Sequence, residues 1–187
     1  MKVVLLGNAG AGKTTLARAL MGADEIPCLA LDEVAFLDGA VRRPLVESIA
    51  AVREFIGRYD HWILEGCYSD IIEPILGDCE ALVFLNPGVA TCIQHCRERP
   101  WEPEKFASPS EQLANLDNLI AWVSEYEVRP DEYGLQRHRR LFDTFRGRKF
   151  ELRSVLPDAA QGGGSYGGYA RRRLSASEAA ILRHEAA

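Results

Sequence analysis

Short apolar runs alternate along the chain with longer segments in which apolar residues recur every three or four positions. Apolar runs without polar alternation are typical of strands that are buried on both faces of a parallel sheet. The sequence therefore predicts an α/β fold of three layers, with helices on both faces of a parallel sheet. The expected strands lie at residues 3–6, 28–31, 61–64, 80–85 and 150–155.

The segments between these strands have helical periodicity, with apolar side chains gathered on one face. We expect helices at residues 14–21, 44–59, 71–76, 89–97, 110–126 and 132–145. The expected apolar stripes are Leu45, Ile49, Val52 and Ile56 in the second helix and Leu113, Leu116, Ile120 and Val123 in the fifth. Residues 1–157 then form one domain, followed by a flexible glycine-rich linker and tail at residues 158–187.

A glycine-rich loop follows the first expected strand directly. Its sequence, GNAGAGKT at residues 7–14, matches the phosphate-binding pattern G-x-x-x-x-G-K-[ST] without a mismatch. Glycines let backbone N–H groups turn inward around a phosphate, and the helix that follows adds more of them. Lys13 would carry positive charge toward the β- and γ-phosphates of a nucleotide, and the Thr14 hydroxyl would bind Mg²⁺. The predicted nucleotide-binding residues are Gly7, Asn8, Ala9, Gly10, Ala11, Gly12, Lys13, Thr14 and Thr15.

Two carboxylates, Asp32 and Glu65, lie where the second and third expected strands end. In an open parallel sheet the carboxyl ends of the strands face the ligand, beside the phosphate-binding loop. A carboxylate there could hold Mg²⁺ or accept a proton from an attacking hydroxyl. Alternatively, either residue could cap the next helix or form a structural ion pair. We predict Thr14, Asp32 and Glu65 as metal-binding residues.

Arginines flank a proline-rich segment after the fourth expected helix. Arg97 and Arg99 lie at the start of residues 97–110, which we interpret as a short lid that closes over the phosphates. The alternative is a solvated basic face at a helix end, where the helix dipole favours cations. Residues 136–150 carry six cations against one acidic residue, and an anion site and a solvated helix face explain them equally well. The predicted catalytic residues are Lys13, Asp32, Arg97 and Arg99.

Composition narrows the function classes further. The net charge of −5 argues against a general nucleic-acid binder, which would be basic. No apolar run approaches the roughly 20 residues needed to span a bilayer, so we expect a cytoplasmic protein without a membrane partner. The five cysteines are expected to be free thiols in a reducing compartment. Cys92, His95 and Cys96 share a helix face, but burial explains them better than a zinc site because no fourth ligand is evident nearby.

Five stretches in order, GNAGAGKTT, CLALDE, WILEGCYSD, VFLNPG and CRERPWEPEKF, resemble the adenylate-kinase-like and shikimate-kinase-like group of P-loop kinases. Within that group the chain looks most like bacterial topology-modulation proteins and proteins assigned as shikimate kinases. The resemblance covers residues 1–155 and implies a P-loop NTPase fold, with a five-stranded parallel sheet of order 2-3-1-4-5 and a short lid. It also implies ATP and Mg²⁺ as cofactors, an acidic residue at Asp32 near the acceptor hydroxyl, and lid arginines at Arg97 and Arg99.

The acceptor does not carry over from this group. Shikimate kinases have three consecutive glycines after the third strand and adenylate kinases have Asp-Gly-Phe-Pro-Arg, whereas this chain has Glu65-Gly66-Cys67-Tyr68. We expect an ATP- and Mg²⁺-dependent small-molecule kinase whose acceptor is unidentified. An anion is one option, with Arg42 and Arg43 as candidates for binding it. The alternative is a nucleotide-dependent binding or regulatory protein that acts on a macromolecular partner such as nucleic acid, through residues 136–150 and the tail.

Overall fold

The computed structural model describes residues 1–21, 26–37, 41–103 and 106–153. Five parallel strands form one sheet of order β2-β3-β1-β4-β5, which confirms the fold class and the strand order expected from the sequence. The predicted tail and residues 104–105 of the predicted lid lie outside the described residues. The strands are β1 (Lys2–Gly7), β2 (Cys28–Ala30), β3 (Trp62–Gly66), β4 (Ala81–Leu85) and β5 (Arg148–Leu152).

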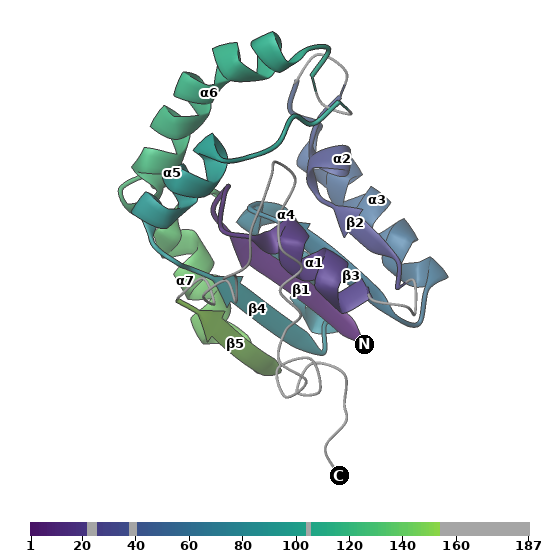
Figure 1. The fold of residues 1–187 in the computed structure, drawn as a ribbon. Coiled ribbons are helices and arrows are strands. Elements are labelled where there is room, and N and C mark those ends of the chain that lie inside the picture. Colours follow the sequence, from purple (N-terminus) through teal and green to yellow (C-terminus); the bar gives the residue numbers. More distant parts are fainter. Residues whose placement is uncertain (22–25, 38–40, 104–105, 154–187) are drawn as a thin grey trace, which may run out of the picture.

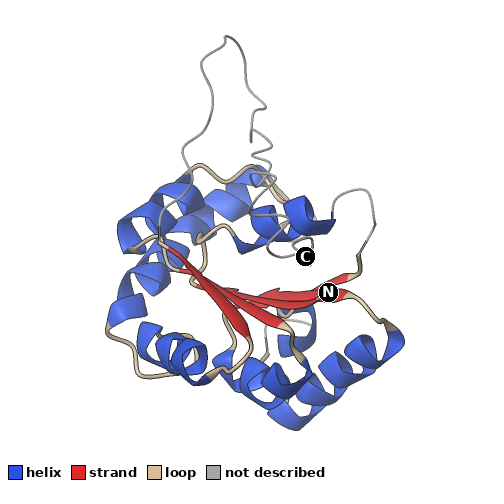
Figure 2. Ribbon diagram, turned by 90° about the horizontal axis from the view of Figure 1, so that it is seen from below, coloured by secondary structure: helices blue, strands red, loops and turns tan. Residues whose placement is uncertain are grey.

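Helices pack on both faces of the sheet (Figure 1), and Figure 2 shows the same layers after a quarter turn. The described α-helices are α1 (Lys13–Met21), α2 (Asp32–Ala35), α3 (Leu45–Arg58), α4 (Ser69–Ile72), α5 (Val89–Arg97), α6 (Pro109–Ser124) and α7 (Leu135–Thr144). Two 3₁₀ helices accompany them, η2 (Glu73–Asp78) and η3 (Glu125–Glu127). None of the described helices is long and apolar enough to cross a bilayer.

The sheet divides the core into two layers. Side chains of a strand point alternately to opposite faces, so Val3 and Leu5 face one layer while Val4 and Leu6 face the other. Helices α1, α5 and α6 cover the first layer, and α2, α3, α4 and α7 cover the second. All four of these β1 side chains are fully buried, as expected from their unbroken apolar run.

The central strands end level with one another at one edge of the sheet. Leu5 of β1 pairs with Glu65 of β3, and Gly7 of β1 pairs with Leu85 of β4. The loop that follows β1 therefore starts beside the last residues of both neighbouring strands. This is the edge at which open parallel sheets bind their ligands.

Three local expectations are wrong. Leu113 and Leu45 are 69% and 42% exposed, because they lie near the starts of α6 and α3, before the residues of those helices that pack into the core. The helix expected at residues 71–76 is divided into α4 and η2, since Pro74 has no N–H to donate to an α-helical bond. Strand β5 begins at Arg148, earlier than expected, because its register pairs it with the whole of β4.

Candidate active site

A tight loop at residues 8–12 joins β1 to α1, and two of its glycines have φ angles that favour glycine. Gly10 and Gly12 have φ of 77° and 96°, in the left-handed region that side chains disfavour. A Cβ atom on Gly10 would overlap the Cys92 carbonyl oxygen on α5 and would lie 2.9 Å from the Cys96 sulfur. Both the backbone conformation and the close approach of α5 therefore require glycine at this position.

Side chains from the loop and from α5 hold the loop in place. The Gly10 carbonyl accepts a hydrogen bond from His95 Nδ1 at 2.7 Å. Asn8 is buried, and its Nδ2 donates to the Val123 carbonyl of α6 at 3.2 Å. Its Oδ1 accepts from the Ala9 N–H at 2.9 Å. The sequence offers His95 as a zinc ligand or, by preference, as a buried residue, and it does not indicate this contact with the loop.

Lys13 is the first residue of α1, and its side chain bends back over the loop. Its Nζ donates to the Asn8 carbonyl at 2.9 Å. The first N–H groups of a helix have no partner within that helix and carry the positive end of its dipole. Left-handed glycines, a helix N-terminus and a lysine on one short loop fit the phosphates of a nucleotide.

The Thr14 hydroxyl donates to Glu65 Oε1 at 2.6 Å. Glu65 is only 8% exposed, and it comes from β3, the strand beside the loop. Mg²⁺ is usually held by one or two protein oxygens, while water and substrate phosphates complete its coordination. The hydroxyl–carboxylate pair supplies oxygens of this kind next to the phosphate-binding loop. Two of the three predicted metal-binding residues are therefore in direct contact.

Asp32, the third predicted metal-binding residue, is exposed at the start of α2, a short helix that the sequence did not predict. Its Oδ1 accepts a hydrogen bond from the Tyr68 hydroxyl at 2.6 Å. Burial is the main cause that raises the pKa of Tyr68 above its ordinary value, and the neighbouring Asp32 charge adds to it. The phenol therefore stays protonated and donates to the carboxylate. Tyr68 is a site residue that sequence reasoning missed.

Cys67 follows β3 beside the charged residues of the site. Its thiol is buried, and burial raises its pKa to about 12. The positive charge of Lys13 opposes this rise, while the carboxylates of Asp32 and Glu65 add to it. All three charges thus act on the same sulfur. Lys13 precedes Thr14, which donates to Glu65, and Asp32 follows two residues after Ala30, the β2 residue that pairs with Glu65. The three predicted residues therefore lie along the carboxyl edge of the sheet.

The predicted lid arginines lie in different surroundings. Arg97 is exposed at the end of α5, whereas Arg99 Nη1 lies 3.3 Å from Glu102 Oε2. Burial raises the pKa of the Cys96 thiol, and the charges of Arg99 and Lys13 both oppose that rise. Arg99 and the loop lysine therefore act on the same sulfur.

The described part of the predicted lid is tied to α6. Gln112 Oε1 accepts from the Glu102 N–H at 2.8 Å, and Gln112 Nε2 donates to the Pro100 carbonyl at 3.0 Å. One α6 side chain thus holds two points of the segment that carries Arg99. Any lid motion of this segment would have to break these two hydrogen bonds or move α6 with it.

Several cations of residues 136–150 take part in internal contacts. Arg139 binds both carboxylate oxygens of Glu151, at 2.9 and 2.5 Å, and this pair holds the pKa of Glu151 down to about 2. Lys149 Nζ donates to two backbone carbonyls at 3.0 Å each, and Arg137 lies 3.8 Å from Glu73. For these three residues a structural role is sufficient.

The cysteines of α5 are packed as apolar residues. Cys92 and Cys96 are 2% and 3% exposed, and burial raises the pKa of Cys92 to about 11. No group of three or more His, Cys, Asp or Glu side chains in the described residues is arranged to hold a metal ion. A magnesium ion bound together with a nucleotide needs fewer protein ligands, because phosphates and water supply the others.

A buried histidine holds the segment after β3 from the other side. His138 of α7 is fully buried, and its Nε2 donates to the Cys67 carbonyl at 2.8 Å. Nδ1 then accepts from the Tyr126 hydroxyl, also at 2.8 Å. Burial lowers the pKa of His138 from 6.5 to about 4. The imidazole is therefore neutral, and it connects η3 and α7 to the loop beside the site.

No protein-family model matches the chain, and no curated protein matches it. Among solved structures it is similar to a gluconokinase from Sinorhizobium meliloti 1021, at 15% identity and a TM-score of 0.46, over 83% of each chain. It is also similar to shikimate kinases from Bacteroides thetaiotaomicron (16% identity, TM-score 0.49, 84% of this chain and 89% of that one) and Aquifex aeolicus vf5 (13%, 0.46, 84% and 88%). The fold of the present chain rests on its own strand order, not on these low scores.

Proposed function

We propose that the protein is an ATP- and Mg²⁺-dependent phosphotransferase that acts on a hydroxyl group of a small molecule. The observation that carries this proposal is the contact between Thr14 and Glu65, directly beside a loop with left-handed Gly10 and Gly12. A phosphate loop alone would serve any nucleotide-binding protein. A metal-binding oxygen pair together with a carboxylate farther along the same edge is what phosphoryl transfer requires.

Different residues would bind the phosphates and the metal ion. The loop N–H groups and Lys13 would bind the β- and γ-phosphates, and Thr14 with Glu65 would hold Mg²⁺. The metal would neutralise charge on the phosphate oxygens as the bond to the leaving oxygen breaks. Most of the rate enhancement would come from positioning and electrostatics, since the protein has little covalent work to do.

Asp32 is placed to serve the acceptor end. In the transfer, the acceptor oxygen forms a bond to the γ-phosphorus, the bond to the bridging oxygen of ADP breaks, and the acceptor loses its hydroxyl proton. Asp32 is exposed and holds a hydrogen bond from Tyr68, so its second oxygen could orient that hydroxyl and receive the proton. Arg99 and Arg97 would neutralise negative charge on the phosphates from the α5 side, as expected from the sequence.

The alternative, a nucleotide-dependent protein that acts on a nucleic acid, finds less support. In that alternative, residues 136–150, which are rich in arginine, would contact the nucleic acid. Arg139 and Lys149 are engaged with Glu151 and with backbone carbonyls, so part of that stretch is used inside the protein. No described contact favours a macromolecular partner over a small one.

The test is ATP consumption with Mg²⁺ against a panel of hydroxyl compounds and nucleoside monophosphates, with a no-acceptor control. Stimulation by one acceptor is expected. Lys13→Ala should lower the stimulated rate on the order of 100-fold, as loss of one charge-stabilising donor does elsewhere. Lys2→Ala is the matched control, because Lys2 begins β1 at the opposite edge of the sheet. Turnover that is indifferent to every acceptor would overturn the proposal.

A further inference from the structure

Arg42 lies in a cage of three aromatic rings beside the proposed acceptor carboxylate. Its guanidinium carbon is 4.9 Å from the ring centre of Tyr68, 5.7 Å from that of Phe36 and 6.0 Å from that of Tyr133. Tyr68 is the same residue that donates its hydroxyl proton to Asp32. The cage therefore adjoins the place where the acceptor hydroxyl would be oriented.

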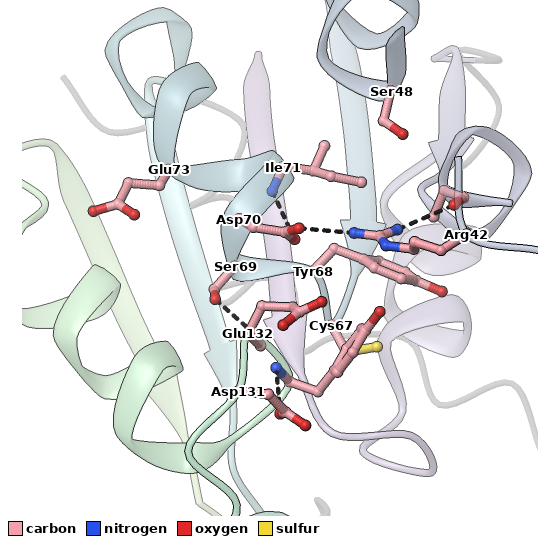
Figure 3. A network of polar contacts seen from close by, with 12 residues as sticks. Arg42, Ser48, Cys67, Tyr68, Ser69, Asp70, Ile71, Glu73, Asp131 and Glu132 are labelled. Carbon is pink, nitrogen blue, oxygen red and sulfur yellow. Dashed lines mark hydrogen bonds and ion pairs between the residues drawn. The ribbon is translucent and has the colours of Figure 1, made fainter. Parts of the chain in front are cut away.

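Each terminal nitrogen of Arg42 already donates a hydrogen bond within the protein. Nη2 donates to Asp70 Oδ2 at 2.8 Å, and Nη1 donates to the Ala35 carbonyl at 3.2 Å (Figure 3). Asp70 is itself fixed, because its other oxygen accepts from the Ile71 N–H at 2.9 Å. An arginine that recognises a carboxylate or phosphate offers two parallel N–H groups to it. Here those terminal nitrogens bind the protein.

A second arginine continues the same pattern. The rings of Tyr68, Tyr133 and Trp122 follow one another with centres 5.4 and 5.6 Å apart. Arg129 lies 4.2 Å from the Trp122 ring centre, and its nitrogens form ion pairs at 3.1 Å with Glu125 and 3.6 Å with Asp131. The aromatic wall, formed by Phe36, Tyr68, Tyr133 and Trp122, thus carries two arginines whose charges are neutralised within the protein.

We propose that the acceptor is an uncharged, hydroxyl-rich compound without a carboxylate or phosphate group, and that Asp70 sets this preference as a positioning residue. The inference rests on the proposed kinase function. An anion would have to displace Asp70 from Arg42 or lie against its negative charge, while also facing the Asp32 carboxylate. An uncharged polyol or sugar-like compound does not compete with Asp70 and is not repelled by Asp32. It can place its C–H faces on aromatic rings and donate hydroxyl hydrogen bonds to Asp32.

Matched acceptor pairs test the proposal through turnover. The pairs are glucitol with gluconate, methyl shikimate with shikimate, and a nucleoside with its monophosphate. We expect the uncharged member of the accepted pair to have a kcat/KM at least tenfold higher. Asp70→Asn should narrow or reverse this ratio, mainly through KM, because it frees Arg42 to bind anions. A wild-type protein that prefers the anionic member would overturn the proposal.

A binding measurement separates the acceptor preference from catalysis. With the phosphate loop filled by ADP, the protein is titrated with tartrate and followed by nitrogen-15 NMR of its arginine Nε–H groups. We expect the Arg42 resonance to be unaffected in the wild type and to respond in Asp70→Asn. Loss of the resonance in Arg42→Gln assigns it to Arg42, and Arg53→Gln, which changes an exposed arginine of α3, is the matched control that should keep both the resonance and its response.

A response of the wild-type Arg42 resonance to tartrate would overturn the acceptor proposal whatever the enzyme turns over. Failure to bind ADP would instead refute the proposed function, and the response of Arg42 to tartrate would still decide whether anions bind at the aromatic wall. If Asp70→Asn does not fold, the wild-type titration and the wild-type acceptor ratio remain decisive on their own.

Discussion

Protonation of His138 should couple the stability of this protein to pH in a narrow window. The imidazole is fully buried, with Nε2 donating to the Cys67 carbonyl and Nδ1 accepting from the Tyr126 hydroxyl. Both ring nitrogens are therefore satisfied in the neutral form. A second proton on Nδ1 would place a positive charge in a site without solvent, which is why burial lowers the pKa of His138 to about 4.

The size of the effect follows from the difference between the two pKa values of His138. Because the folded pKa lies below the unfolded value of 6.5, the unfolded chain binds this proton first as the pH falls. The contribution of the neutral His138 to the free energy of unfolding is therefore fully present above pH 6.5, and it is lost as the pH falls to about 4. One pKa unit corresponds to about 1.4 kcal/mol, so the whole loss is about 3 kcal/mol. About 2 kcal/mol of it falls between pH 7 and pH 5.

Urea unfolding of the wild type and of His138→Gln at pH 7, 6 and 5 measures this coupling. The glutamine keeps a donor for the Cys67 carbonyl but cannot titrate. Between pH 7 and pH 5 the free energy of unfolding of the variant should therefore fall by about 2 kcal/mol less than that of the wild type. His61→Gln, which changes an exposed histidine, should keep the wild-type slope. Equal pH slopes for wild type and His138→Gln would refute the reasoning, because they would mean that the buried imidazole accepts a proton without cost.

Three further changes test separate parts of the structure. Gly10→Ala should cost at least ~1–2 kcal/mol of stability from the left-handed conformation alone and weaken ADP binding. Gly57→Ala, whose Cβ meets nothing within 4 Å in α3, should instead stabilise by ~0.5 kcal/mol; equal unfolding free energies and ADP affinities for the two variants would contradict this. Glu65→Gln should lower turnover roughly 10–100-fold and raise the Mg²⁺ concentration required for half-maximal turnover. An unchanged Mg²⁺ dependence in the ATP-consumption assay would argue against a metal role for Glu65. Arg139→Gln should raise the pKa of Glu151 from about 2 toward 4.5, followed by carbon-13 NMR. The pair's stabilisation is present above pH 4.5 and lost as the pH falls toward 2, so a Glu151 pKa that stays near 2 in the variant would show that Arg139 is not its cause.

The parts of the fold that could be predicted are those encoded by neighbouring residues. The loop at residues 8–12 is a contiguous stretch, so its place between a strand and a helix could be predicted from local spacing. Glu65 could be placed because the ends of buried parallel strands meet at one edge. The strand order was expected from a resemblance, since periodicity alone indicates strands without ordering them.

The contacts that complete the site could not be read in the same way. Asn8 bonds to Val123, which is 115 residues away, and His138 bonds to the Cys67 carbonyl across 71 residues. Hydrophobic periodicity indicates which face of a helix is buried, but it does not say which polar group on another element will meet it. Arg42 illustrates the consequence. Its charge suggested an anion site, and only the fold reveals that Asp70 already neutralises it.

Residues 65–70 connect the proposed nucleotide end of the site to its proposed acceptor end. Glu65 accepts from Thr14 on the phosphate side, while Tyr68 and Asp70 hold Asp32 and Arg42 on the acceptor side. The carbonyl of Cys67, between them, is held by α7. A substitution within this segment can therefore change turnover through either end. For this reason Asp70→Asn is judged by a ratio between two acceptors and Glu65→Gln by its Mg²⁺ dependence. Variants of Lys13 and Arg42, which lie outside the segment and touch one end each, separate nucleotide binding from acceptor binding without that ambiguity.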